Sequence, residues 1–252
     1  MHRVRIASGY HAGDTITLPK TEAHYVARVL RLRSGHEVQA FDGTGQAYRL
    51  RLTTVSATTV QGQLLASLAS GVPGAASLIL GQALPKGSKM DLIIEKCAEL
   101  GLTTLVPVYT ARTVVREVAA RLPEKLGRWQ RVAEAAARQC GRQVLLELCA
   151  PLSWVDFCAR YSSAPAKLVC WEEEQHYSLR QALNTLPGQP PLVVLIGPEG
   201  GLTSEEVTLA RTYGFVTVSL GPHALRTETA AIAVTSIIRY HLGELEPQGE
   251  RL

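Results

Sequence analysis

The feature that most constrains the fold of this chain is a regular alternation of apolar strands and amphipathic helices, which begins near residue 76. Apolar segments of strand length recur at 76–84, 103–109, 144–148, 167–171, 191–197 and 215–220. Helical periodicity fills much of the sequence between them. Continuous apolar strands separated by helices are typical of a parallel sheet that is covered on both faces. This part of the chain therefore predicts an α/β domain.

Three of the expected helices have clear ends. The first spans 88–100, where Ser88 and Asp91 have the spacing of a capping box and Gly101 ends the helix. A long helix over 124–140 stops at Gly141. The last, over 227–242, places Ala230, Val234, Ile237 and His241 on one face.

The first 70 residues have a different pattern. Residues 21–32 place Tyr25, Val29 and Leu32 at helical spacing, and two stretches of period-two alternation follow, separated by a turn at 42–45. We expect one helix and a small β-barrel-like sheet. The stretch 69–74 then has the glycine and proline content of a linker.

The net charge of +4 is unevenly distributed. Residues 1–70 contain eight lysines and arginines against four acidic residues, whereas the remaining 182 residues carry equal numbers of each sign. A segregated basic segment can attract a polyanion such as nucleic acid. The alternative is an ordinary solvated surface.

Composition excludes several classes of protein. With 46% hydrophobic and 19% charged residues, the chain can bury a sizeable core. Its five cysteines form no CxxC pair, which favours reduced thiols in a cytoplasmic protein over a disulfide framework or zinc site. Its seven histidines contain no HExxH motif, so we expect no metal. We also expect neither a secretory signal nor a membrane span, because no apolar run is long enough.

Two glycine-containing loops follow strands, where ligands bind in open α/β sheets. The first is Gly197–Gly201, before a helix that Thr203 and Glu206 are expected to cap, and the second is Leu220–Leu225. Neither matches GxxxxGK[ST] or GxGxxG, and Glu199 would repel a triphosphate. The loops favour a positively charged ligand bound through backbone groups, such as an adenosyl sulfonium. Two ordinary tight turns are the alternative.

The segments KGSKMDLIIEKCAELG, RQCGR, LIGPEGGLTSEEV and LGPHALRTETA resemble, in this order, bacterial methyltransferases that modify N3 of a uridine in small-subunit (16S) ribosomal RNA (the RsmE family). That family belongs to the SPOUT superfamily. The stretch HYVARVLRLRSGHEVQAFDGTG resembles the RNA-binding domain of the same proteins. The resemblance covers nearly the whole chain. Three positions depart from the family pattern: His223, Ala224, which replaces a larger aliphatic residue, and Arg138.

The resemblance implies a PUA-like β-barrel domain over 1–72 and a trefoil-knotted α/β methyltransferase domain over 73–252. It also implies a cytoplasmic homodimer that acts on small-subunit ribosomal RNA, which we expect to be in the assembled subunit rather than naked. S-adenosylmethionine would bind at the two loops, at Ile196, Gly197, Glu199, Gly200, Leu220 and Leu225.

Two residues are catalytic candidates. Arg226 would stabilise the negative charge that develops on the uracil ring, or it would pair with Glu228 or Glu199. Glu228 would accept the N3 proton, or it would stabilise the start of the last helix. For RNA binding we expect Arg28, Arg31, Arg33 and Arg142, whereas Lys86 and Lys89 are solvated or contact phosphates. The alternative functions are ribose 2′-O-methylation and a non-catalytic role in ribosome assembly.

Overall fold

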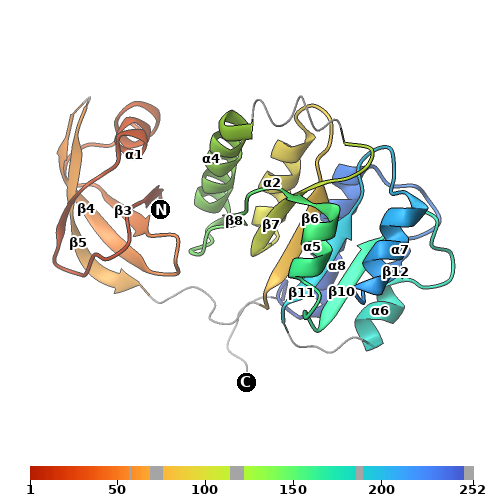
Figure 1. Cartoon of the computed structure of the whole chain (residues 1–252). Coiled ribbons are helices and arrows are strands. Elements are labelled where there is room, and N and C mark those ends of the chain that lie inside the picture. The colour runs from red at the N-terminus through yellow and green to blue at the C-terminus, as the bar shows by residue number, and fades with distance from the viewer. Residues whose placement is uncertain (57, 69–75, 114–121, 186–189, 247–252) are drawn as a thin grey trace, which may run out of the picture. The chain divides into compact units, whose positions relative to one another are not determined.

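Two separate sheets organise the chain (Figure 1). The computed structural model describes residues 1–56, 58–68, 76–113, 122–185 and 190–246. They divide into two compact units, one made of Met1–Gly74 with Glu134–Leu145 and the other of Ala75–Ala133 with Leu146–Leu252. The sequence did not indicate that residues 134–145 return to the first unit. Within the described part of the chain, no helix is both long and apolar enough to cross a membrane.

The first unit contains a five-stranded sheet in the order β1-β3-β4-β5-β2. Its strands are β1 (Arg3–Arg5), β3 (Glu37–Phe41), β4 (Ala47–Val55), β5 (Val60–Leu68) and β2 (Thr15–Thr17). β1 and β3 run parallel and the other pairs are antiparallel. Alternate side chains point inward, so that Val38, Leu50 and Leu64 are completely buried in one core. The predicted small, mostly β domain is thus confirmed.

The helical part of this unit differs from the prediction. α1 (Lys20–His24) continues into the π-helical turn η1 (Tyr25–Val29), in which the amide of Leu30 bonds to the carbonyl of Tyr25. This wider turn changes which side chains face the sheet. Val26 is therefore buried and Val29 is 59% exposed, so the predicted apolar face through Val29 is wrong.

The returning segment is fixed by arginines that sequence alone would assign to the surface. It starts within α4 (Leu122–Cys140). Arg3 donates to the carbonyl oxygens of Ala137 and Arg142 and stacks on Phe41. Nη1 of Arg138 lies 2.5 Å from Oε1 of Glu22, which is buried. Burial raises the pKa of Glu22, and the charge of Arg138 opposes that shift.

The second unit contains a parallel sheet in the order β12-β10-β11-β6-β7-β8, with the short β9 (Leu152–Ser153) also paired to β7. Its other strands are β6 (Leu78–Ala83), β7 (Thr104–Tyr109), β8 (Glu147–Leu148), β10 (Ala166–Cys170), β11 (Leu192–Ile196) and β12 (Val216–Val218). All six predicted strands are present. β8 is shorter than the predicted 144–148, because Val144 instead bridges Gly43 and Thr44 in the first unit.

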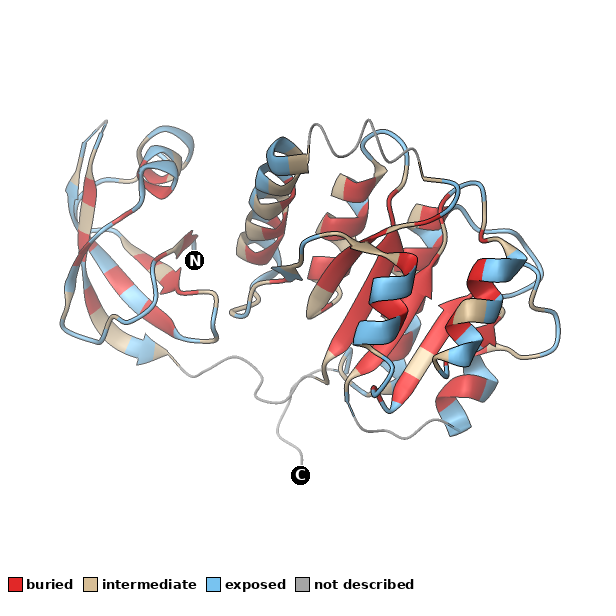
Figure 2. Ribbon diagram, in the orientation of Figure 1, coloured by how far each residue is buried: buried red, intermediate tan, exposed pale blue. Residues whose placement is uncertain are grey.

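Helices cover both faces of this sheet (Figure 1). α5 (Trp154–Arg160) and α7 (Ser204–Thr212) pack on one face, against Ile79, Val193 and Leu195. α2 (Lys89–Glu99) and α8 (Thr227–His241) pack together on the other, and α6 (Leu179–Thr185) follows β10. Figure 2 shows the strands between these layers as almost entirely buried. This is the doubly covered α/β architecture predicted from the sequence.

The predicted helix ends and faces are only partly right. Thr203 and Glu206 form the expected capping box at the start of α7. Ser88 precedes α2 but makes no side-chain capping bond, so the capping box predicted there is wrong. In α8 the buried face runs through Ala230, Ala231, Val234, Thr235 and Ile238. Ala230 and Val234 of the predicted face are thus buried, whereas Ile237 and His241 are exposed, because the buried stripe continues through Ile238.

Candidate functional site

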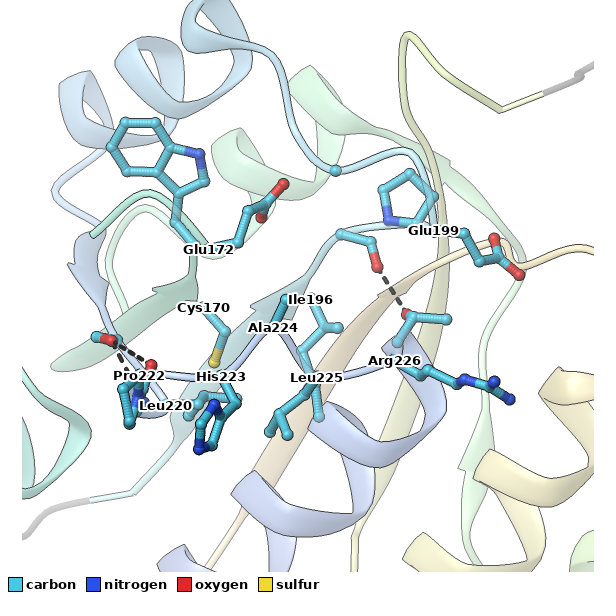
Figure 3. A pocket seen from close by; sticks show the side chains of 18 of the residues that line it. Cys170, Glu172, Ile196, Glu199, Leu220, Pro222, His223, Ala224, Leu225 and Arg226 are labelled. Atoms are coloured by element: carbon cyan, nitrogen blue, oxygen red, sulfur yellow. Dashed lines mark hydrogen bonds between the residues drawn. The ribbon is translucent and has the colours of Figure 1, made fainter. Parts of the chain in front are cut away.

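A cavity of about 650 Å³ lies at the carboxyl ends of β10, β11 and β12. Three segments line it, one following each strand, together with the start of α8 and one residue of α2. They contribute Cys170–Glu172, Ile196–Glu199 with Gly201, Ser219–Thr227, Ala230 and Lys89. Figure 3 shows Glu199 and Arg226 at one end of the cavity and Pro222 with His223 at the other. Both loops singled out in the sequence thus meet at one site.

The loop after β11 requires glycine at two positions. A Cβ on Gly197 would lie 2.9 Å from Cγ of Leu202, closer than side chains normally approach. Gly201 has a φ of +74°, and a Cβ there would overlap the carboxylate of Glu172. Side chains at these positions would push the loop into the cavity or displace the groups beside it. The glycines therefore keep backbone groups at the wall of the cavity.

The loop after β12 ends directly at α8. Arg226 has an extended backbone and precedes Thr227, the first residue of that helix. The hydroxyl of Thr227 donates a hydrogen bond of 2.7 Å to the carbonyl oxygen of Gly197, one of those drawn in Figure 3. This bond joins the two loops across the cavity wall.

A lysine neutralises two carboxylates at the same end. Nζ of Lys89 lies 3.0 Å from Oε1 of Glu199 and 3.4 Å from Oε2 of Glu228. The backbone N–H of Lys86 also donates to Glu199, at 3.0 Å. Partial burial raises the pKa of Glu199, but the hydrogen bonds from Lys89 and from backbone amides outweigh it, so that the pKa lies below its usual value. The hydrogen bond to Glu199 likewise raises the pKa of Lys89.

Two charged side chains of the lining stand apart from that cluster. Arg226 and Glu172 are exposed and line the cavity. Within the described ranges, neither forms an ion pair. The alternative role of Arg226, an ion pair with Glu199 or Glu228, is not observed. Lys89 forms the ion pairs with both carboxylates instead. Arg226 and Glu172 are therefore available to a ligand.

The structure brings most of the predicted cofactor residues together. The lining includes Ile196, Gly197, Glu199, Leu220 and Leu225. Gly200 is outside the lining: its carbonyl accepts a hydrogen bond from Arg112, and a Cβ would lie 3.1 Å from the Arg112 side chain. Of the catalytic candidates, Arg226 lines the cavity, whereas Glu228 does not and reaches it through Lys89.

Sequence reasoning missed several residues of the site. Lys89 was predicted to be solvated or to contact phosphates, and Glu172, Trp171 and Thr227 were not assigned to it. Trp171 and Glu172 follow β10, so the rule that ligands bind beyond strand ends would have found them. Nothing in the sequence would have indicated that Lys89 is shared by two distant carboxylates.

Cys170 lines the cavity but has the properties of a structural thiol. Burial raises its pKa to about 12, so the thiolate is not populated near neutral pH. All five cysteines are free, and three of them, Cys97, Cys158 and Cys170, are buried. Over the residues with described positions, no three metal-ligating side chains are grouped.

The predicted RNA-binding arginines have different surroundings in the first unit. Arg28, Arg31 and Arg33 are exposed, and none of them forms an ion pair in the described part of this unit. Three other arginines there are paired, since Arg5 pairs with Glu134, and Arg49 and Arg51 pair with Glu37. Arg142 is half-buried, and its side chain donates to the carbonyl of Val144. The positive charges of this unit that pair with no described residue thus include those of Arg28, Arg31 and Arg33.

Comparison with known proteins is consistent across the chain. Residues 73–239 match the model of an RNA methyltransferase domain, and residues 18–65 match that of an RNA methyltransferase PUA domain. The ribosomal RNA small subunit methyltransferase E of Synechocystis is 37% identical over 232 residues, which are 91% of this chain and 74% of that protein. The protein of the same name from Bacillus subtilis is 29% identical, over 90% of each chain.

Solved structures with the same fold include two that hold a ligand. A putative methyltransferase from Legionella pneumophila, in complex with the cofactor SAM, has a TM-score of 0.87 and 30% identity over 94% of this chain and 96% of its own. A ribosomal RNA small subunit methyltransferase E from Neisseria gonorrhoeae, bound to S-adenosyl methionine, has a TM-score of 0.86 and 28% identity. The match covers 95% of this chain and 97% of the Neisseria chain.

Proposed function

The chain belongs to the ribosomal RNA small subunit methyltransferase E family, and we propose that it transfers a methyl group from S-adenosylmethionine to N3 of a uridine in small-subunit ribosomal RNA. The observation that carries this proposal is the cavity between the Gly197–Gly201 and Leu220–Leu225 loops. It combines loop backbone with a carboxylate, that of Glu172, and a guanidinium, that of Arg226, which form no ion pair with any described residue.

The cavity fits S-adenosylmethionine in size and charge. A volume of about 650 Å³ lies within the range of small-molecule sites. The cofactor carries a sulfonium and an ammonium, and Glu172 offers a carboxylate that no described residue pairs. The lysine of the lining is already shared by Glu199 and Glu228, so it is poorly placed to hold a phosphate. A Cβ at position 201 would overlap the carboxylate of Glu172, so glycine there leaves that carboxylate in place beside the cavity.

Arg226 supports the transfer step. When bound, the cofactor supplies a methyl group activated by the positive sulfur. Loss of the N3 proton leaves negative charge on the uracil ring, and a fixed guanidinium beside it lowers the barrier. Arg226 lies at the junction of the second loop and α8, has an extended backbone and lines the cavity. We assign it this role.

Glu228 is our candidate for the acceptor of the N3 proton. It lies in the first turn of α8, two residues from Arg226, and its side chain is 13% exposed. Lys89 holds its carboxylate at 3.4 Å and itself lines the cavity. A carboxylate so oriented has the chemistry of a general base.

The residues proposed for RNA binding all lie in the first unit. We propose that the domain over 1–72 contacts phosphates through Arg28, Arg31 and Arg33, and that Arg142 contributes from the returning segment. The exposure of Arg28, Arg31 and Arg33 supports this. We propose the assembled small subunit in the cytoplasm as the substrate.

We further propose that the domain over 73–252 is knotted and acts as a homodimer. The support for the dimer is an exposed apolar strip along α8. Ile237 is 44% exposed and Tyr240 is 68% exposed, three positions apart and hence on one side of the helix. Such a strip would be covered by a second copy.

The experiment that tests the proposed reaction is methylation of small subunits that lack the modification. Purified protein is incubated with radiolabelled S-adenosylmethionine, and the RNA is digested to nucleosides for mass analysis. We expect the label in 3-methyluridine. Label in a ribose-methylated nucleoside would favour 2′-O-methylation, and no label with intact cofactor binding would favour a non-catalytic role.

A further inference from the structure

Gln82 is a fully buried amide at the end of a strand that is otherwise apolar. It lies in β6, and its partner in the neighbouring strand β11 is Ile196, the residue before Gly197. Burying an amide is unfavourable unless hydrogen bonds compensate for the lost water. The partners of Gln82 therefore indicate why an amide is present there.

The amide has one orientation. Its Nε2 donates to the carbonyl oxygen of Ala83 and to the hydroxyl of Thr227, both at 2.9 Å. A carbonyl only accepts hydrogen bonds, so the nitrogen and not the oxygen of Gln82 faces Ala83. The hydroxyl of Thr227 then accepts from Gln82 and is left to donate to Gly197, at 2.7 Å. The result is a directional chain from Gln82 through Thr227 to Gly197.

This chain ends in the cavity wall. Gly197 and Thr227 both line the cavity, and Thr227 directly follows Arg226. Gln82 itself lies behind them and has no exposed surface. Its hydrogen bond therefore acts on the relative position of the two loops rather than on a ligand.

The amide is also incompletely satisfied. Oε1 of Gln82 is buried and, within the residues described, has no hydrogen-bond partner. A buried acceptor without a partner lowers stability, and an apolar side chain of similar shape would avoid that cost. Stability alone would thus favour an apolar residue at this position.

We propose that Gln82 is a positioning residue for methyl transfer. It fixes the hydroxyl of Thr227 and thereby fixes the position of the Gly197 loop relative to Arg226. The proposal rests on the proposed function of this cavity. Its consequence is that removal of the amide weakens cofactor binding without a matching decrease in stability.

The test uses four variants and one control variant. Gln82→Met removes the donor at nearly constant shape, Thr227→Val removes the hydroxyl, and their combination removes both. Thr227→Ser keeps the hydroxyl. As a control, Thr235→Val removes another buried hydroxyl of α8, which bonds to the Ala231 carbonyl and is not in the cavity lining. The readouts are the Kd for S-adenosylhomocysteine by calorimetry, KM and kcat for methyl transfer, and Tm.

We expect Gln82→Met and Thr227→Val each to raise the Kd roughly fivefold, the factor that corresponds to one hydrogen bond. The Kd of the double variant should be no higher than the higher of the two single-variant Kd values, because both changes break the same chain of hydrogen bonds. Thr227→Ser should bind the cofactor more tightly than Thr227→Val does, because it keeps the hydroxyl, and Thr235→Val should lower Tm without changing the Kd. If Gln82→Met does not fold, the comparison of Thr227→Val with Thr227→Ser tests the proposal by itself.

Unchanged affinity in Gln82→Met and Thr227→Val would overturn the positioning role, as would fully additive effects in the double variant. These outcomes leave the proposed function intact, since wild-type binding is measured in the same series. Absence of binding by the wild-type protein would instead contradict the proposed function, and the role of Gln82 with it.

Discussion

Nζ of Lys89 lies 3.0 Å from Oε1 of Glu199, so the first residue of α2 is joined to the loop that follows β11. The same ammonium lies 3.4 Å from Glu228 in the first turn of α8. One lysine therefore connects a helix to the two segments that carry the candidate cofactor and base residues.

Lys89→Met should destabilise the protein in a pH-dependent way. The pKa of Glu199 is lowered from 4.5, so its contribution is present above that value and is lost as pH falls through the lowered pKa. The pKa of Lys89 is raised from 10.5, so its contribution is present below that value and is lost as pH rises further. The difference in Tm between wild type and variant should be constant between these limits and shrink in acid. A difference that persists unchanged at a pH well below the lowered pKa of Glu199 would mean that Lys89 acts by packing.

Arg226→Ala should separate chemistry from binding. If the guanidinium stabilises charge only in the transition state, kcat should fall by roughly 10²–10³-fold while the Kd for the cofactor changes much less. Steady-state methyl transfer and calorimetry measure the two quantities. A normal kcat in a folded variant would make Arg226 structural.

Reversing Arg28, Arg31 and Arg33 to Glu should weaken RNA binding and flatten its salt dependence. For each phosphate that the variant no longer neutralises, the log–log slope should decrease by roughly 0.7–0.9, because fewer counterions are released. A matched control reverses three exposed arginines of the second unit, Arg131, Arg160 and Arg180. Cofactor affinity should not change in either variant. An unchanged slope in the first variant, or an equal change in the control, would remove the RNA-binding role from this segment.

Glu22→Ala should destabilise the first unit far more than Glu37→Ala. Glu22 is buried and pairs with Arg138, and removal of one member of a buried pair leaves the other uncompensated, at a cost of about 3 kcal/mol. Glu37 pairs with exposed arginines, for which a cost of about 0–1 kcal/mol is expected. Denaturant unfolding of both variants provides the comparison. Equal decreases in stability would show that the buried pair does not fix the returning segment.

Several local patterns were sufficient, although the capping box predicted from Ser88 and Asp91 does not form. Strand and helix alternation predicted the second unit, and Thr203 with Glu206 predicted the start of α7, because capping depends on residues three positions apart. The two loops were found since they follow apolar strands. The predictions that failed also have physical reasons. The π-helical turn moved Val26 inward in place of Val29, and no periodicity rule for an α-helix describes that turn.

Ion pairs and hydrogen bonds between residues far apart in the sequence could not be predicted. Arg138 pairs with Glu22, which is 116 residues away in the sequence. Lys89 and Gln82 were not assigned to the site for the same reason, since their partners at 199, 227 and 228 are brought to them only by the sheet.

The central claim is that the cavity bounded by Gly197 and Leu225 binds S-adenosylmethionine, and calorimetric titration tests it most directly. Wild-type protein should bind S-adenosylmethionine and its demethylated product but not ATP. Gly197→Val should abolish that binding, because even its Cβ would lie 2.9 Å from Leu202. Gly200→Val, outside the lining but against Arg112, should also prevent it by displacing the loop. Gly127→Val, in the exposed part of α4, should bind normally. Wild-type affinity in folded Gly197→Val and Gly200→Val, or no binding by the wild type, would contradict the assignment of this cavity.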